Sequence, residues 1–229
     1  MRRTIFAVAA IVLAACAQPA HTAGEALQPC AALQMSGELT PGECRLEASG
    51  QTLHVRFAEL AAGMQSGNVS IDVIGSDGQV DQTVLESDVS EYRAPSVQDV
   101  DGDGRGDILI PLMTGNVNTD YAVWLYSGAD GRFERVGAVS GVEIKRTDEG
   151  YVAVPARSGA ASWTVSFFRL DQEGLHPLVT LQIDGEEVGG AIRSTCTVLE
   201  GDGLAAIGLN ERAAQEKFCA EPAAQVFGP

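Results

Sequence analysis

The sequence predicts an all-β fold, with antiparallel strands in a sandwich or in barrel-like sheets and one short helix near the C-terminus. Short runs of alternating apolar and polar residues recur along the chain. Gly- and Asp-rich turn signals separate these runs at a spacing of about 8–12 residues, which is typical of sandwiches and barrels. No segment of helical period separates most of the runs, which argues against a parallel α/β architecture.

The strands follow one another through most of the chain. Turn signals at 75–78, 127–131 and 148–150 predict hairpins between neighbouring strands. The run at 108–112 is continuously apolar and predicts a buried strand. The expected strands are residues 52–59, 68–74, 79–85, 96–99, 108–112, 121–126, 133–136, 142–145, 151–154, 161–170 and 175–183.

The clearest alternation lies at 52–59, where Leu53, Val55 and Phe57 share one face. His54 falls on the opposite face, so we interpret it as a surface residue rather than a catalytic one. The strand aromatics allow two interpretations, a ligand groove or core packing, and we expect the core. These aromatics are Tyr121, Trp124, Tyr126 and Trp163.

One helix is predicted near the C-terminus. Asn210 can cap its first turn, and Glu211 suits the positive N-terminal end of a helix. Residues 213–217 are helix formers. Phe218 and Cys219 follow and would hold the helix against the sheet.

The N-terminus has the pattern of an export signal followed by a lipidation site. Two arginines precede an apolar run at 5–12, and Leu-Ala-Ala-Cys follows at 13–16, which resembles a bacterial lipobox. We expect a signal peptide over residues 1–15 and a lipid on Cys16; the alternative is an ordinary cleaved signal. Ala17, in place of an Asp, favours the outer membrane, facing the periplasm or the cell surface. Residues 16–29 then form the lipidated Cys and a flexible tether.

Residues 30–229 are expected to form a single β-rich domain. This segment holds four cysteines, and an even number in an exported chain indicates disulfides. Three pairings are possible, and we expect the local ones, Cys30 with Cys44 and Cys196 with Cys219. A cysteine metal site is not indicated, because the chain has no CxxC pair and no His–Cys cluster.

The chain is strongly acidic, with 31 Asp and Glu against 15 Lys and Arg and a formal net charge of −16. Such a field repels nucleic acid and favours cations and basic proteins as partners. We therefore expect no nucleic acid to bind.

Residues 99–107, read as DVDGDGRGD, form the most specific motif of the chain, here named the acidic loop. Its four carboxylates fall at loop positions 1, 3, 5 and 9. This spacing suits a hard cation with six to eight oxygen ligands. We predict a Ca²⁺ site; the alternative is a solvated acidic turn, because Asp-Gly pairs are common turn formers. The expected ligands are Asp99, Asp101, Asp103, the Arg105 carbonyl and Asp107.

The loop differs from an EF-hand, which requires a bidentate Glu at position 12 and a following helix. Here position 12 is Ile110, within an apolar strand. The motif instead resembles the FG-GAP (VCBS-like) calcium loops of integrin type, which lie between two strands. Such repeats normally occur in arrays that form propellers, and this chain has a single DxDGDG run. A propeller is therefore not expected.

The resemblance extends from Asp99 to Leu170, through the acidic loop, GNVNTDYAVWLY, GRFERV and RSGAASWTVSFFRL. This order resembles small exported bacterial β-rich proteins with a single integrin-like calcium loop, some of which are similar to periplasmic i-type lysozyme inhibitors. The resemblance implies a basic lysozyme as a partner. The SGxxY-type signature of c-type lysozyme inhibitors is absent. A Ser-Gly turn at 157–159 could serve as an inhibitory loop or as an ordinary hairpin.

The sequence favours a non-catalytic binding module. The expected domain has two histidines, His54 and His176, and no G-x-S-x-G, HExxH or P-loop motif. We therefore expect a membrane-anchored calcium-binding lipoprotein, with lysozyme inhibition as the first alternative and a hydrolase of unknown class as the second.

Overall fold

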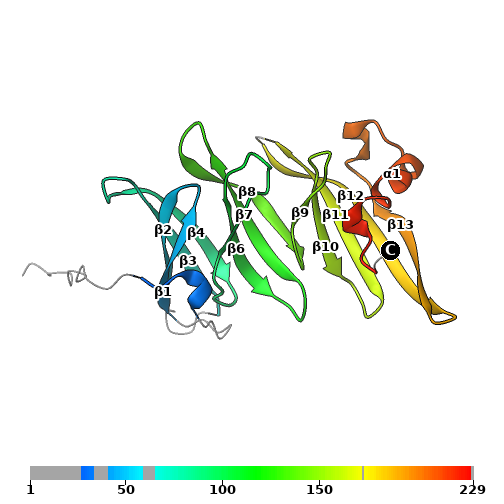
Figure 1. Ribbon diagram of the computed structural model, residues 1–229, viewed down its shortest axis with the longest axis horizontal. Coiled ribbons are helices and arrows are strands. Elements are labelled where there is room, and N and C mark those ends of the chain that lie inside the picture. Colours follow the sequence, from blue (N-terminus) through cyan, green and yellow to red (C-terminus); the bar gives the residue numbers. More distant parts are fainter. Residues whose placement is uncertain (1–26, 34–40, 59–64, 172, 228–229) are drawn as a thin grey trace, which may run out of the picture.

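The structure is a computed structural model that describes residues 27–33, 41–58, 65–171 and 173–227. The predicted signal peptide, Cys16 and the first part of the tether lie outside these residues. The described chain forms three antiparallel sheets that lie in a row (Figure 1). The predicted all-β class is therefore confirmed, and none of the described sheets closes into a barrel.

The strands follow the chain from one sheet to the next. Sheet A has the order β1 (Gly42–Ala48), β2 (Gln51–Phe57), β3 (Gly67–Ile74), β4 (Val80–Val89). Sheet B has the order β5 (Ser96–Gln98), β6 (Asp107–Thr114), β7 (Thr119–Ser127), β8 (Arg132–Gly141). Sheet C has the order β13 (Ala191–Glu200), β12 (Gly174–Val188), β11 (Ser162–Asp171), β10 (Val152–Arg157), β9 (Lys145–Arg146).

Most expected strands are present, with three corrections. The strand expected at 142–145 is wrong for 142–144, because regular pairing there is limited to β9, where Lys145 and Arg146 pair with β10. Strands β1 and β13 were not expected from the sequence. Strand β13 is an edge strand whose residues are almost all exposed, so its sequence lacks the apolar alternation that marks a half-buried strand.

Sheet B lies in the middle of the row and is buried on both faces. Ile108 and Ile110 pack into the core that it shares with sheet A, whereas Leu109 and Val123 pack into the core that it shares with sheet C. A strand covered on both faces needs apolar residues at successive positions. This explains the continuous apolar run at the start of β6.

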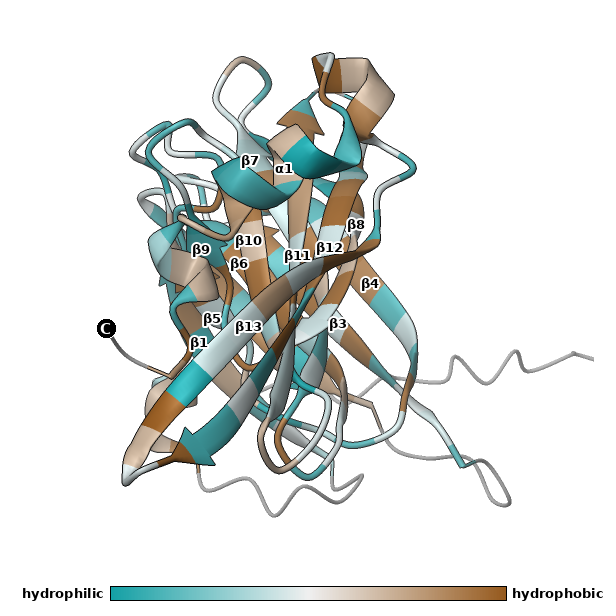
Figure 2. Cartoon of the chain, turned by 90° about the vertical axis from the view of Figure 1, so that its right-hand side faces the viewer, coloured by the Kyte–Doolittle hydropathy of each residue, from teal (hydrophilic) through white to brown (hydrophobic). Residues whose placement is uncertain are grey.

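The two outer sheets, A and C, differ in what covers their outward faces. The outward face of sheet A is polar: Asp72 accepts hydrogen bonds from Arg56 at 2.6 Å and from Thr83 at 2.7 Å. Sheet C instead packs against the C-terminal segment, where Phe218 contacts the core residues Phe167 and Tyr151. Figure 2 shows apolar residues concentrated on the central strands and hydrophilic ones on many of the turns.

The predicted helix is α1 (Glu211–Phe218), and the side chain of Asn210 caps it by accepting a 2.9 Å hydrogen bond from the Ala213 N–H. Three short 3-10 helices, η1 (Cys30–Ala32), η2 (Leu204–Ile207) and η3 (Pro222–Ala224), complete the elements. No helix in the described ranges is long and apolar enough to cross a membrane.

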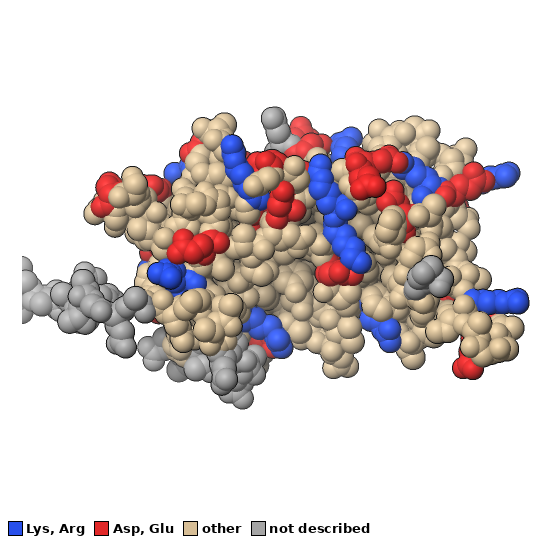
Figure 3. All heavy atoms as spheres, viewed as in Figure 1, with Lys and Arg blue, Asp and Glu red and all other residues tan. Residues whose placement is uncertain are grey.

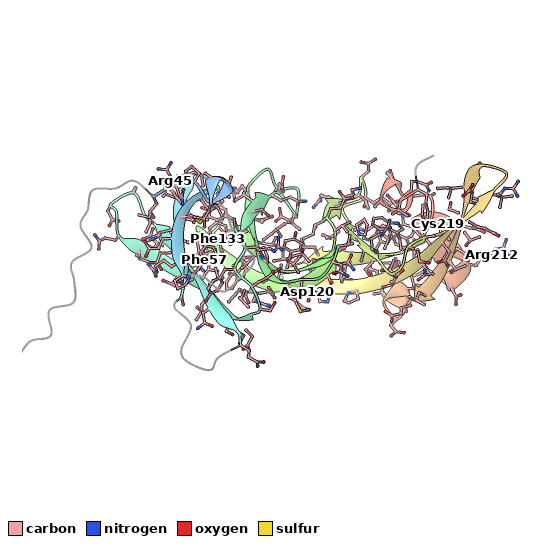
Figure 4. All side chains as sticks on the ribbon, turned by 90° about the horizontal axis from the view of Figure 1, so that it is seen from below. Arg45, Phe57, Asp120, Phe133, Arg212 and Cys219 are labelled. Atoms are coloured by element: carbon pink, nitrogen blue, oxygen red, sulfur yellow. A yellow bond between two sulfur atoms is a disulfide. The ribbon has the colours of Figure 1, made fainter. Side chains whose placement is uncertain are left out.

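Both predicted disulfides are present. Cys30–Cys44 joins η1 to β1, and Cys196–Cys219 joins β13 to the end of α1. Figure 4 labels Cys219, and it also labels Phe57 and Phe133, which come from sheets A and B and belong to one core cluster. The two bridges therefore fix η1 and the end of α1 to the strands β1 and β13.

Candidate metal centre

The acidic loop connects β5 to β6, at the end of sheet B where the β7–β8 turn also lies (Figure 1). The two strands pair from Gln98 with Asp107, so the loop leaves and re-enters the sheet at neighbouring positions. Gly102 and Gly104 have φ values of +75° and +84°, which non-glycine residues rarely adopt. The backbone of the loop therefore favours glycine at these two positions.

Three of the predicted ligands come together. Asp99, Asp101 and Asp107 each offer a carboxylate oxygen, and these oxygens all lie within 4.8 Å of one another. Asp99 is exposed, Asp101 is half-buried and Asp107 is buried. The group therefore has one end open to solvent and one end inside the protein.

The other two predicted ligands are Asp103 and the backbone carbonyl of Arg105. Asp103 lies outside the close group; its carboxylate accepts a 2.8 Å hydrogen bond from the Arg105 N–H and lies 3.8 Å from the Arg105 guanidinium. The Arg105 side chain points away to the β7–β8 turn, where it lies against Gly128 and over the ring of Tyr126.

Backbone hydrogen bonds hold the exposed carboxylates in place. Asp99 accepts from the N–H groups of Gly102 at 2.6 Å and Gly104 at 3.0 Å, and Asp101 accepts from Asp103 at 3.0 Å. These contacts are typical of Asp-rich turns. They fix the carboxylates near one another without supplying a positive charge.

Asp107 is fully buried and accepts hydrogen bonds from two separate backbone segments, the acidic loop and β7. Its Oδ2 accepts from the Val100 N–H at 2.7 Å, and its Oδ1 accepts from the Tyr126 N–H at 2.9 Å. Burial, joined by repulsion from Asp101 and Asp103, raises the pKa of Asp107 to about 6, although the two N–H groups act in the opposite direction. The folded protein therefore resists a negative charge at this position unless a cation compensates it.

Asp101 shows the same effect in a milder form. Burial raises its pKa, and the charges of Asp103 and Asp99 add to the rise, while the guanidinium of Arg146 lowers it. Arg146 belongs to β9, and a Cβ placed on Gly102 would come within 2.5 Å of its Nε. One arginine thus faces a group of three carboxylates, which leaves the site negative.

The donor set fits a calcium ion. All three close ligands are carboxylates, the ligand type that hard cations prefer. Calcium binds oxygen at about 2.3–2.6 Å, so two of its ligands lie at most about 5 Å apart. The 4.8 Å spread of the three oxygens meets that limit.

The acidic loop touches all three sheets. Ser49, in the β1–β2 turn of sheet A, donates a 2.8 Å hydrogen bond from its Oγ to the Gly106 carbonyl. Tyr126 of sheet B and Arg146 of sheet C supply the contacts described above. Order in this loop is therefore coupled to the packing of the whole row of sheets.

A second polar group, not predicted from the sequence, lies at the β11–β12 turn. Asp171, Glu173 and His176 each offer a ligand atom within 4.8 Å of the others. The backbone N–H of Glu173 lowers the pKa of Asp171, with further contributions from His176 at 2.8 Å and Arg169 at 3.1 Å. Asp171 thus has one cationic partner, Arg169, and a hydrogen-bond partner in His176. Its contact with His176 lies across the β11–β12 hairpin, where Asp171 pairs with Gly174, and the spacing of these residues did not predict it.

The strand aromatics pack mainly into the protein, as expected. Trp124 contacts the core between sheets A and B and donates its indole N–H to Glu86 at 2.6 Å, and Trp163 packs against the core of sheet C. Tyr126 also packs on the core between sheets A and B, with its ring centroid 5.1 Å from that of Phe133, and it lines a surface cleft as well.

The remaining candidates lie away from the acidic loop. His54 is on the outward face of sheet A, 3.1 Å from Glu43, in agreement with its assignment as a surface residue. The Ser-Gly turn at 157–159 forms a tight hairpin in which Ser158 and Gly159 both donate to the Ser162 carbonyl. This hairpin lies at the opposite end of the strands from the acidic loop (Figure 1).

No known protein family matches the chain, and no curated protein matches it. Among solved structures, it is similar to one described as the structure of a Xanthomonas type IV secretion system related protein. The TM-score is 0.46 with 12% sequence identity, over 71% of this chain and 90% of the other. A similarity of this degree assigns neither a family nor a function.

Proposed function

We propose that this chain is an exported, lipid-anchored calcium-binding protein that acts by binding a partner in the periplasm or at the cell surface. The observation that carries the calcium assignment is the approach of three carboxylate oxygens to within 4.8 Å, one of them fully buried. Lipid anchoring rests on the sequence of residues 13–16. The single FG-GAP (VCBS-like) calcium loop is part of the same proposal.

The ion would be held by Asp99, Asp101 and Asp107, with Asp103 and the Arg105 carbonyl as the further sequence-predicted ligands. It would supply the positive charge that the buried carboxylate lacks. Outside the cytoplasm calcium is plentiful, so a Kd as weak as about 10⁻⁴–10⁻³ M would keep the site occupied.

The experiment is a calorimetric calcium titration of the metal-stripped chain from residue 17 onward. We expect one ion per chain, with binding abolished in the double variant Asp99→Asn/Asp101→Asn. Glu186→Gln/Glu187→Gln, at exposed positions of the β12–β13 hairpin, controls for the loss of two charges. No heat on titration, together with an unchanged melting temperature on adding EDTA to untreated protein, would reduce the loop to an acidic turn.

A binding role, rather than catalysis, is supported by the surroundings of the two histidines of the described chain. His54 contacts Glu43 at 3.1 Å and His176 contacts Asp171 at 2.8 Å, and both pairs lie at least partly exposed, so each ring nitrogen involved already has a carboxylate partner. Turnover by the purified protein in a panel of hydrolase assays would overturn this part of the proposal.

Lysozyme inhibition is the narrower candidate. It is supported by the net charge of −16, which suits a basic enzyme, and by the resemblance of residues 99–170 to exported proteins that include i-type lysozyme inhibitors. A turbidity assay against c-, g- and i-type lysozymes tests it. Full lysozyme activity in a molar excess of the protein would exclude this candidate and leave the calcium proposal untouched.

A further inference from the structure

A cleft of about 540 Å³ opens between sheets B and C, beside the acidic loop. Its apolar wall is formed by Leu125 and Val136 of sheet B and Leu170 of sheet C, all of them half-buried. A volume of this size lies within the usual range of binding clefts.

The cleft is built where the two sheets meet at the β11–β12 turn. Gly174 approaches β8 so closely that a Cβ on it would come within 2.7 Å of the Val136 carbonyl oxygen. At that point sheets B and C touch. The cleft is therefore a consequence of the way the sheets pack, and the segments that line it belong to strands and short turns.

The polar part of the lining carries one sign of charge. Asp101, Asp130, Glu134 and Asp171 line the cleft, and no Lys or Arg of the described segments does so. Asp171 already pairs with Arg169 and His176. Among the described residues, neither Asp130 nor Glu134 forms an ion pair. Figure 3 shows acidic side chains along the upper part of the visible face, with Lys and Arg side chains among them.

We propose that this cleft binds an arginine side chain presented by a basic partner protein, with the arginine stem on Leu125, Val136 and Leu170 and its guanidinium on Asp130 and Glu134. The proposal rests on the proposed binding function and gives it a site. It does not require the calcium ion, because Asp130 and Glu134 lie outside the acidic loop.

An arginine fits both parts of the lining. Its aliphatic stem covers apolar surface while its head stays polar. Its planar guanidinium forms bidentate hydrogen bonds with carboxylates, and arginines inserted in pockets are frequent hot spots of protein interfaces. The net charge of −16 would also steer a basic protein towards the chain.

The test is an amide chemical-shift titration of the mature chain with the peptide acetyl-Gly-Arg-Gly-amide. We expect saturable shifts centred on residues 125–136 and 170–171. The same peptide with citrulline, which keeps the shape and lacks the charge, should produce none. Shifts of equal size with citrulline, or shifts spread evenly over the acidic surface, would overturn the proposal.

The matched variants are Asp130→Asn/Glu134→Gln in the cleft and Glu186→Gln/Glu187→Gln on the distant β12–β13 hairpin. Both pairs remove two charges from exposed positions. We expect the cleft pair to weaken peptide binding roughly 3- to 30-fold, as the loss of two exposed ion pairs implies, and the hairpin pair to leave it unchanged. Equal effects of the two pairs would show that only the overall charge matters.

Titrations in calcium and in EDTA separate this proposal from the calcium assignment. We expect the peptide to bind in both. Peptide binding without calcium binding would refute only the proposed metal site, and calcium binding without peptide binding would refute only the proposed arginine cleft. Spermidine that binds the same residues more tightly than the peptide would also overturn the assignment to a protein arginine.

Discussion

Asp107 combines two roles that are separate in most acidic turns. Its side chain joins the acidic loop to β7 through the Tyr126 N–H, and it is also the buried member of the three-carboxylate group. Asp99 and Asp101 lack a bond of this kind to a distant strand. The buried residue therefore fixes the position of the group.

Neighbouring carboxylates of the loop should differ in their effect on calcium binding. Asp101→Asn removes a member of the close group, whereas Asp103→Asn removes a carboxylate that contacts Arg105. We expect the first variant to lose most of the calcium-induced rise in melting temperature and the second to lose less. Melting curves with calcium and with EDTA measure this. Two variants that melt like the parent in saturating calcium would contradict a metal site.

The pKa of Asp107 predicts a pH dependence. In the metal-free protein its pKa is raised from 3.8 to about 6, so the stability from the protonated form is fully present below 3.8 and is lost as the pH rises through about 6. Calcium needs the ionised carboxylate, so its apparent affinity should fall by up to about tenfold per pH unit below that pKa. Calcium titrations at about pH 5, 6 and 7.5 measure the trend. A calcium affinity at about pH 5 equal to that at about pH 7.5 would exclude Asp107 as a ligand.

At the scale of elements, β6 is the strand most sensitive to substitution, because its first residues are buried on both faces. Ile108 is 0% exposed and packs between sheets A and B, whereas Leu85 of β4 is 56% exposed. We expect Ile108→Ala to lower the free energy of unfolding by about 2–5 kcal/mol and Leu85→Ala by less than about 0.5 kcal/mol. Urea unfolding of both variants measures the difference. Similar losses would show that sheets A and B are not packed as described.

The elements that could be predicted are those whose sequence carries a local signal. The alternation of Leu53, Val55 and Phe57 predicted β2, and Asn210 predicted the start of α1. Strand β13 has no such signal because it lies at an exposed edge. Residues 142–144 are apolar enough for a strand, but the chain there crosses from sheet B to sheet C, and Ile144 packs into the core between the two sheets.

At the scale of the whole molecule, the acidic loop lies where sheets A, B and C meet. Removal of calcium should therefore loosen several turns together, namely the β1–β2 turn at Ser49, the loop itself and the segment at Arg146. We expect faster amide hydrogen exchange in all three on adding EDTA, with no change in the β12–β13 hairpin. Exchange that increases in the loop alone would show that the sheets are not coupled through it.

The sequence by itself determined the all-β class, the capped helix and the acidic loop, because each depends on residues that are close together in the chain or on a short repeated pattern. It left three disulfide pairings possible, and the structure confirmed the local one. Tertiary structure decided the rest. The stacking of three sheets selects Asp107 as the buried carboxylate and brings Arg146 beside Gly102. The same packing places Glu134 and Leu170 in one cleft. These groups come from different sheets, and the faces by which sheets pack against each other are set by long-range contacts that no local pattern encodes.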